Sequence, residues 1–502
     1  MLHDNVHHKA VEDYLLKRFF MKKYMYILAL FFACSSIYAR KKQPNLLIIH
    51  TDEHSFRTLS CYQKLMPENQ AFVWGKGNNV QTPYIDRIAN EGAICMNYYA
   101  SSPVCTPSRA SLVTGLYPQA TGAPKNGMSI RQDVQTFAQV LSEAGYATSY
   151  VGKWHLDGHR KYKFDIAYNA GFDDNRYMMT GGHAPYFQIN NEVIIALGQR
   201  QAQRMQSNGE QDITYVTDFF TDKTLEILER DKDKPFCVML SIPDPHTPDV
   251  AREPYVSMYK EMPVRAPFTM SPEYTEKKPQ WGRGGRDDKN EVKQFNPDAL
   301  RNYFGMVKCI DDNVGRILKF LDDNDLTDNT IVVFTADHGD MFFEHNRLNK
   351  GVPYEASSRI PFVIRYPREI VPGKVIRKAY TNVDFAPTIL SLMHVNNSLK
   401  CHGTDTSTDF LSNDREVSGE RITYFAKNGG WWVCAVNRHY KLILDKKEKP
   451  WLIDLDKDPF ETTNYYYHSD YKDIAKLFQK ELYVLMKKFD EPGLKTQPYI
   501  TE

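Results

Sequence analysis

Short apolar runs alternate with amphipathic segments over most of the chain between residues 44 and 395. The runs at 44–50, 147–152, 236–241, 330–336 and 360–366 are almost continuously apolar, which is typical of strands buried on both faces of a sheet. Residues 299–324 instead place apolar side chains three and four positions apart, as a long amphipathic helix does. This alternation predicts an α/β fold with a central sheet flanked by helices.

Shorter helices are predicted between these strands. The spacing of apolar residues and the flanking cap residues indicate helices at 82–92, 108–115, 136–144 and 216–230. In this interpretation Ser108 caps the second of them, so that the helix N-terminus and its local field lie at this serine.

The pattern changes beyond about residue 395. Segments at 422–425, 431–436, 441–444 and 451–455 are short and separated by turn residues, which is the pattern of an antiparallel sheet. Residues 471–488 then predict a closing helix. We therefore expect an α/β domain over 44–395 and a smaller C-terminal antiparallel-sheet subdomain over 396–502.

The N-terminus has the pattern of a targeting signal. Residues 24–39 carry no charge and follow the basic start Met21-Lys22-Lys23. This run is shorter than the roughly 20 apolar residues of a membrane-spanning helix, and it is typical of a secretory signal peptide over 21–39, cleaved at Ala39. Residues 1–20 then lie upstream of the true start. We expect export, to the periplasm or beyond; a lipid anchor at Cys34 and a cytosolic location are the alternatives.

The composition excludes several classes of protein. Apolar residues make up 42% and charged residues 25% of the 502 residues, which excludes a mostly disordered chain, a collagen-like fibre and a polytopic membrane protein. Lys plus Arg number 63 against 62 for Asp plus Glu. The net charge of +1 therefore gives no overall field that would gather nucleic acid. Eight cysteines are too few for a disulfide scaffold.

Two acidic pairs follow two of the predicted strands, Asp52-Glu53 after the first and Asp337-His338 after 330–336. Ligands of open α/β sheets collect beyond the carboxyl ends of the strands. Carboxylate oxygens with one imidazole suit Ca²⁺ or Mg²⁺, although histidine also admits Mn²⁺ or Zn²⁺. One such pair alone would more often be a turn or a helix cap. Two pairs after two apolar strands favour a metal site formed by these four residues.

The sharpest motif is the run Cys105-Thr106-Pro107-Ser108-Arg109, which a short helical segment and Thr114-Gly115 follow. It resembles the signature of the type I sulfatases, a family of the alkaline-phosphatase-like superfamily in which the cysteine is oxidised after translation to formylglycine. The resemblance implies an α/β domain with a mixed central sheet and a smaller C-terminal sheet. It also implies a sulfuric ester hydrolase acting on a sulfated saccharide, and a maturation enzyme that generates formylglycine from Cys105.

The resemblance extends from about residue 44 to residue 464. It is carried by Gly152-Lys153-Trp154-His155, Pro245-His246-Thr247-Pro248, Ala336-Asp337-His338-Gly339-Asp340, Lys350 with Tyr354-Glu355 and Arg359-Ile360-Pro361, and residues 455–464. By analogy with the family, the catalytic residues are Cys105, Arg109, Lys153, His155, His246 and Lys350. In the metal set the family often has Asp in place of Glu53 and Asn in place of His338. Both variants can coordinate a metal, but Glu53 is the weakest of the four ligands and Ca²⁺ is not fixed over other ions.

The chemistry of a sulfate ester explains why these residue types are needed. A hydrated aldehyde at Cys105 has two hydroxyls: one attacks sulfur and releases the alcohol, and the other then loses its proton, re-forms the carbonyl and expels sulfate. Arg109 lies about one helical turn further on and can face the same site. A divalent ion lowers the pKa of the hydrate and binds a sulfate oxygen.

The remaining residues supply charge and protons. Lys153 and Lys350 provide positive charge for the transition state, and a histidine is the natural proton donor near neutral pH. By family analogy His155 steadies the hydrate, whereas His246 and Lys350 face the sulfate and the leaving oxygen.

Three functions compete at this point. The first is an exported sulfatase acting on sulfated sugars, and the second is a phosphonate or phosphodiester hydrolase of the same superfamily. The third is a glycan-binding relative without activity, against which the presence of all six catalytic residue types argues. The sequence leaves the sugar, the sulfate position and the oligomeric state open.

Overall fold

The computed structural model describes Met21 and residues 43–190, 193–283, 291–292, 294–396 and 398–500. Residues 1–43 and 44–502 form two separate units, and the second is described here. The expected signal peptide beyond Met21, with the alternative anchor site Cys34, lies outside the described residues. Among the helices described, none is both long and apolar enough to cross a membrane.

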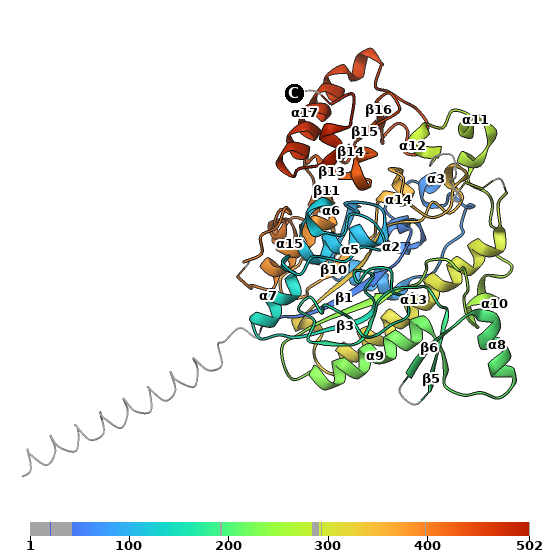
Figure 1. The fold of residues 1–502 in the computed structure, drawn as a ribbon, viewed down its shortest axis with the longest axis vertical. Coiled ribbons are helices and arrows are strands. Elements are labelled where there is room, and N and C mark those ends of the chain that lie inside the picture. The colour runs from blue at the N-terminus through green and yellow to red at the C-terminus, as the bar shows by residue number, and fades with distance from the viewer. Residues whose placement is uncertain are drawn as a thin grey trace, which may run out of the picture. The chain divides into compact units, whose positions relative to one another are not determined.

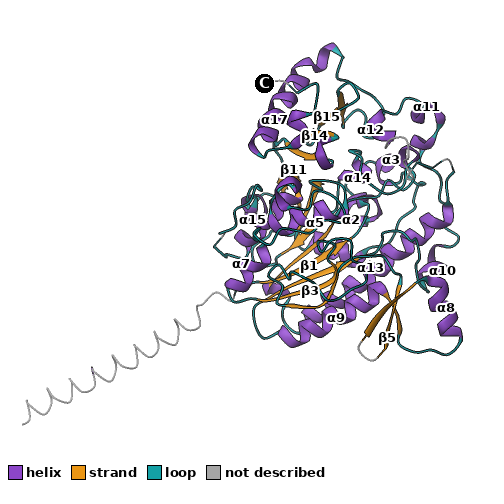
Figure 2. Cartoon of the chain, in the orientation of Figure 1, coloured by secondary structure: helices purple, strands orange, loops and turns teal. Residues whose placement is uncertain are grey.

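A mixed sheet of nine strands forms the centre of the described chain (Figures 1 and 2). Its strands are β1 (Asn45–Thr51), β2 (Ala93–Tyr99), β3 (Ala147–Lys153), β4 (Asp174–Met179), β8 (Phe236–Ile242), β9 (Thr330–Ala336), β10 (Phe362–Arg365), β11 (Lys374–Thr381) and β12 (Glu416–Val417). The order is β12-β11-β2-β10-β9-β1-β8-β3-β4. Only β10 within this sheet runs antiparallel to its neighbours. The predicted α/β class with a mixed central sheet is confirmed.

Helices cover both faces of this sheet. The helices are α2 (Ser60–Gln63), α3 (Glu68–Ala71), α4 (Pro83–Asn90), α5 (Cys105–Thr114), α6 (Pro118–Thr121), α7 (Phe137–Glu143), α8 (Gln199–Ser207), α9 (Val216–Asp231), α10 (Tyr255–Tyr259), α11 (Pro272–Thr275), α12 (Gln280–Arg283), α13 (Pro297–Asp323), α14 (Glu355–Ser358), α15 (Phe385–Leu392), α16 (Ser407–Leu411) and α17 (Lys472–Lys488). Apolar residues of α4, α9 and α13 pack in one core, and those of α5, α7 and α15 in another.

Strand β1 shows why its sequence is apolar throughout. Leu47 and Ile49 belong to the core of α4, α9 and α13, whereas Leu46 and Ile48 belong to the core on the other face. Successive side chains of a strand point to opposite faces, so a strand covered by helices on both sides needs apolar residues at every position.

The C-terminal region contains the predicted antiparallel sheet. Its strands follow one another in the order β13 (Thr423–Ala426), β14 (Trp432–Val436), β15 (Tyr440–Asp445) and β16 (Trp451–Asp454). Helix α17 packs on one face through Phe478 and Leu482. The other face packs on the central domain, where the rings of Phe425 and Tyr99 stack with centroids 5.6 Å apart.

A third sheet was not predicted. It is antiparallel, with the order β6-β5-β7, and consists of β5 (Tyr186–Asn190), β6 (Val193–Leu197) and β7 (Ile213–Tyr215). Its strands are only partly buried, so the chain here lacks the continuous apolar runs that identify the central strands.

The helix predicted at 108–115 begins three residues earlier than expected. Helix α5 starts at Cys105 after the extended residue Val104, whose carbonyl oxygen accepts a 3.0 Å hydrogen bond from the Ser108 backbone. Ser108 is therefore not the cap. Pro107 fits inside the first turn because the backbone N–H groups there have no helical partner to lose.

Candidate active site

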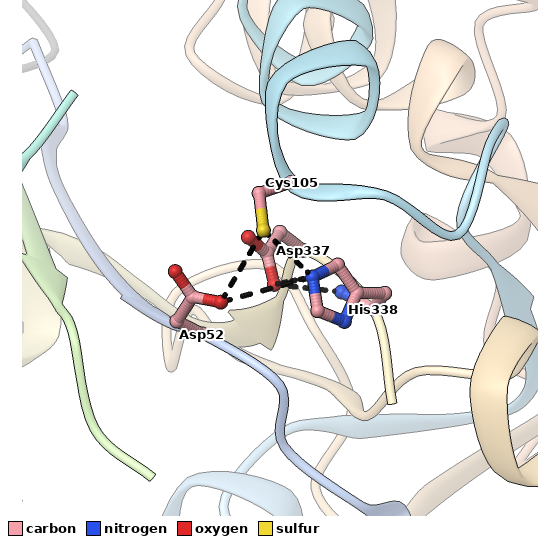
Figure 3. A group of neighbouring side chains, drawn as sticks. All are labelled: Asp52, Cys105, Asp337 and His338. Atoms are coloured by element: carbon pink, nitrogen blue, oxygen red, sulfur yellow. Dashed lines mark hydrogen bonds and ion pairs between the residues drawn. The ribbon is translucent and has the colours of Figure 1, made fainter. Parts of the chain in front are cut away.

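Cys105 is the first residue of α5 and is buried. Its side chain points from the helix end toward Asp337 and His338 (Figure 3). The Cys105 Sγ atom lies 3.2 Å from His338 Nε2 and 3.8 Å from Asp52 Oδ1. The positive end of the helix dipole thus falls at the predicted nucleophile.

Two adjacent parallel strands bring the acidic groups to this point. Thr51 of β1 is aligned with Ala336 of β9, so Asp52 and Asp337 leave neighbouring strands at the same edge of the sheet. Both carboxylates and the His338 ring are fully buried. The Nε2 atom of His338 lies 3.3 Å from Asp337 Oδ1 and 3.7 Å from Asp52 Oδ1.

This group could hold a metal ion. One ligand atom from each of Asp52, Cys105, Asp337 and His338 lies within 4.8 Å of the others. Burial, together with the nearby charge of Asp52, raises the pKa of Asp337 above its usual range. A cation placed among these oxygens and the imidazole would relieve that repulsion, and the donor set suits a divalent ion.

The Glu53 carboxylate does not join Asp52, Asp337 and His338. Its backbone N–H donates a 3.1 Å hydrogen bond to Asp337 Oδ1, but its Oε2 atom lies 3.0 Å from His246 Nε2 and 3.2 Å from Lys350 Nζ. The structure therefore brings three of the four predicted ligands together and leaves the Glu53 side chain on the opposite side of the site.

Arg109 ties the acidic groups to the strand ends. Its Nε atom donates to Asp337 Oδ2 at 2.9 Å, and its Nη2 atom donates to Asp52 Oδ2 at 3.1 Å. Its Nη1 atom donates to the Lys153 carbonyl oxygen at 2.8 Å and to Ser241 Oγ at 2.7 Å. Because each nitrogen of the guanidinium donates a hydrogen bond, Arg109 holds both carboxylates in position.

Lys153 and a histidine that sequence reasoning missed lie beside Asp52. The Lys153 ammonium forms an ion pair with Asp52 Oδ2 and lies 2.5 Å from His183 Nε2. The His183 ring stacks on His246, with centroids 3.5 Å apart and an angle of 4° between the planes. No motif marks His183; the preceding glycines 181 and 182, which follow β4, were the available signal for a close backbone approach.

His155 lies next to Cys105. Its carbonyl oxygen accepts a 2.9 Å hydrogen bond from Thr106 Oγ1, in the first turn of α5. Burial and the neighbouring Lys153 lower the pKa of the imidazole, against the opposing effect of Cys105. A neutral ring in this position can accept or donate one hydrogen bond at the nucleophile.

His246 and Lys350 face the site from its other side. The His246 Nδ1–H donates to the Thr247 carbonyl oxygen at 2.6 Å, and its Nε2 atom accepts from Lys350 Nζ at 2.7 Å. Burial opposes the charge of Lys350, but Cys105 and Glu53 raise the pKa of its ammonium above the ordinary value. The backbone carbonyl thus orients the ring and directs its Nε2 atom toward the centre of the site.

The surrounding charges also act on Cys105. Burial and Asp52 oppose ionisation of the thiol, yet Lys350, Lys153 and His338 outweigh them and hold its pKa well below the usual value. The six residues predicted as catalytic therefore lie close together at the end of β1 and β9, although they come from positions 105 to 350 of the chain.

The chain matches two models of protein families. The model described as sulfatase matches residues 44–395, and the model described as N-sulphoglucosamine sulphohydrolase, C-terminal, matches residues 343–488. The N-acetylglucosamine-6-O-sulfatase of Bacteroides thetaiotaomicron is 29% identical, over 89% of this chain and 86% of that protein.

Solved structures agree with this result. A protein in complex with its substrate D-glucosamine-2-N,6-O-disulfate superposes with a TM-score of 0.73 and 25% identity, covering 90% of this chain and all of that one. The phosphonate monoester hydrolase of Agrobacterium radiobacter shares the fold, with a TM-score of 0.66 and 20% identity over 89% of this chain and 96% of its own. The chain belongs to the sulfatase family and is a sulfuric ester hydrolase.

Proposed function

We propose that the protein removes sulfate from the 6-position of an amino sugar, using formylglycine at residue 105 and a divalent metal. The observation that carries this proposal is the position of Cys105, at the N-terminus of α5 and in contact with two carboxylates and an imidazole. A maturation enzyme is the partner that the proposal requires, because the encoded residue is cysteine.

The formylglycine hydrate supplies an oxygen nucleophile for sulfur and a second hydroxyl whose deprotonation expels the bound sulfate. The positive end of α5 and the ammonium groups of Lys153 and Lys350 stabilise the negative charge on the sulfate. His155 accepts or donates a hydrogen bond at residue 105 and so fixes the orientation of the hydrate.

Asp52, Asp337 and His338 would hold the metal, which would supply Lewis-acid chemistry and offset the negative charge of the site. Glu53 is the fourth ligand predicted from the sequence, and to serve as one its carboxylate has to turn away from His246 and Lys350. We favour Ca²⁺ because oxygen donors predominate, with Mg²⁺ as the alternative.

His246 protonates the leaving sugar oxygen from its doubly protonated form, because in the neutral ring described above Nε2 carries no proton. Its Nε2 atom faces the site beside Lys350, its Nδ1–H is held by a carbonyl oxygen, and His183 packs flat against its ring. A ring fixed on three sides can deliver a proton in one direction, which is what general acid catalysis requires.

The substrate class is supported by the relatives. One is named as an N-acetylglucosamine-6-O-sulfatase and another was solved with a 6-O-sulfated glucosamine. We propose that this release of sulfate serves glycan degradation outside the cytoplasm. This agrees with the export, periplasmic or extracellular, that we propose from the pattern at 21–39, with Cys34 as the alternative lipid anchor.

The test measures kcat/KM on four substrates with one preparation of the protein. N-acetylglucosamine 6-sulfate and its 3-sulfate isomer are compared with a phenyl phosphonate and a phosphodiester. We expect the largest kcat/KM on the 6-sulfate. A larger kcat/KM on the phosphorus esters would favour the alternative, a phosphonate or phosphodiester hydrolase, and a preference for the 3-sulfate would contradict the proposed position.

A further inference from the structure

A cavity of about 540 Å³, lined by both polar and apolar side chains, lies outside the site described above. It is bounded by β5, β7, α8, α9 and α10, and Figure 1 shows β5, α8 and α10 near one another. Its wall includes Tyr186, Gln199, Gln203, Gln206, Asp218 and Arg252. The volume lies within the range of pockets that bind small molecules or single sugar residues.

The wall offers uncharged hydrogen-bonding groups. Within the described chain the side chains of Gln199, Gln203 and Gln206 make no hydrogen bond, and neither does the Tyr186 hydroxyl. Each amide provides donors and an acceptor. The Tyr186 ring also packs at 75° against the Tyr215 ring, so a rigid aromatic surface lines part of the cavity.

The charges in the wall do not favour an anion. Arg252 is engaged by Asp218, with one hydrogen bond of 2.8 Å and a second shorter one, and its third nitrogen donates to the Glu253 carbonyl oxygen. Asp218, Glu253 and Arg252 together leave one negative charge in the wall. A ligand rich in hydroxyl groups and without sulfate or carboxylate therefore fits this chemistry.

Two chain segments connect the cavity with the active site. Tyr186 follows His183 by three residues, and Ala251 follows His246 by five. Three residues span at most about 11 Å. The Tyr215 hydroxyl donates to the Val250 carbonyl oxygen at 2.8 Å and so fixes the second segment against the small sheet. The cavity therefore lies within reach of a short oligosaccharide held at the two histidines.

We propose that this cavity binds an unsulfated sugar residue next to the sulfated one, so that the protein prefers an oligosaccharide to a free sulfated sugar. The proposal rests on the proposed function, because it extends the same substrate beyond the sulfate. Amides and a tyrosine hydroxyl would bond the sugar hydroxyls, and the aromatic pair would face the sugar ring.

The experiment compares N-acetylglucosamine 6-sulfate with a tetrasaccharide that carries it at one end, followed by unsulfated galactose, N-acetylglucosamine and galactose. We expect the wild type to have a higher kcat/KM on the tetrasaccharide. In the double variant Gln203→Ala/Gln206→Ala the ratio of the two kcat/KM values should fall about tenfold, as for two lost hydrogen bonds. Gln201→Ala is the matched control, because Gln201 is exposed on the same helix but does not line the cavity.

A wild-type ratio of one or less, or a ratio that the double variant leaves unchanged, would overturn the proposal. Saturation-transfer NMR with the unsulfated trisaccharide tests the cavity without turnover: binding to the wild type and to Gln201→Ala, but not to the double variant, is expected. If no sulfated sugar is hydrolysed at all, the proposed function is wrong, and the NMR result alone decides whether the cavity binds sugar.

Discussion

The roles of individual side chains can be separated by the leaving group of the substrate. A sugar alkoxide leaves poorly without a proton, whereas nitrophenolate leaves well without help. Replacing His246 by Ala should therefore lower kcat/KM on a sulfated sugar by roughly 100-fold or more, and much less on nitrophenyl sulfate. Steady-state kinetics on both substrates measures this difference.

The control for this variant is His468→Ala, which removes an exposed histidine of the C-terminal region. Equal losses on both substrates in the His246 variant would show that this residue mainly binds sulfate. The acid would then have to be Lys350 or His155.

Metal binding provides a second test at single residues. Asp337→Ala removes one of the three side chains that the structure brings together, and the purified protein should lose its metal, about one ion per chain in the wild type. Chelation of the wild type should abolish activity, and added Ca²⁺ or Mg²⁺ should restore it. Elemental analysis measures the ion directly.

Glu53→Gln separates the two possible positions of that side chain. If Glu53 turns to the metal, this variant should bind the ion more weakly; if it stays with His246 and Lys350, metal content should be unchanged. Full activity of metal-free wild-type protein would contradict the proposed metal centre as a whole.

Motifs predicted which side chains lie together in the candidate site where the sequence itself is distinctive. Cys105 and Arg109 share one short motif, and Asp52 and Asp337 follow unmistakable strands. His183 could not be predicted, because its contact with His246 depends on two loops whose sequences carry no shared pattern. The orientation of Glu53 was equally out of reach, since it is decided by neighbours almost 200 and 300 positions away.

Strand β3 packs very closely against β8 at Gly152, the residue that precedes Lys153. Gly152 has a φ of +103°, and a Cβ atom there would lie 1.9 Å from the Ser241 carbonyl oxygen. Gly152→Ala should therefore lower the free energy of unfolding by about 3 kcal/mol or more, and it should reduce activity in the protein that remains folded. Denaturant unfolding and kinetics measure the two effects.

Gly145→Ala is the matched control. Gly145 also has a positive φ, +88°, but a Cβ atom there would meet nothing within 4 Å. Its cost should be limited to backbone strain of about 1–2 kcal/mol, with activity retained. If the two variants lower the free energy of unfolding equally, the close approach of Gly152 to Ser241 does not contribute to stability.

The turn formed by Glu344–Asn346 makes stability depend on pH. His345 is buried there and stacks on Tyr354 at a centroid distance of 3.9 Å. Burial, together with the nearby Lys278, lowers the pKa of His345 to about 3. The unfolded chain therefore binds more protons between about pH 3 and pH 6.5, so stability rises with pH across this window and is lost on acidification.

His345→Asn should reduce the slope of the unfolding free energy against pH. The reduction is at most the contribution of one proton, roughly 1.4 kcal/mol per pH unit. Asparagine tolerates the left-handed backbone at this position, where φ is +52°. Urea unfolding at several pH values measures the slope. A slope identical to that of the wild type would show that His345 does not bind its proton on unfolding.

Elements could be predicted where burial imposes a pattern. Strand β9 has the bounds that were predicted, and the apolar stripe of α13 is buried from Phe304 to Leu321. The small sheet at β5, β6 and β7 was missed because its strands are partly exposed. The start of α5 was misplaced because a proline near a helix end is compatible with both a boundary and a first turn.

At the scale of the whole molecule, the fold gathers residues that are far apart in the sequence at one edge of the sheet. Parallel pairing of β1 with β9 and β8 brings positions near 52, 337 and 244 together. Cys105 is 1% exposed in this arrangement. If residue 105 is converted to formylglycine as proposed, the maturation enzyme would need the chain before it folds, and we predict that the refolded cysteine form resists conversion.

Mass spectrometry can test whether residue 105 acts as formylglycine. The peptide containing residue 105 is analysed from protein made with and without a formylglycine-generating enzyme, and sulfatase activity is measured on the same samples. We expect the mass of the aldehyde or its hydrate only in the first sample, activity in proportion to that fraction, and none in Cys105→Ala. Full activity of Cys105→Ala, or of protein whose residue 105 is entirely cysteine, would show that formylglycine is not the nucleophile.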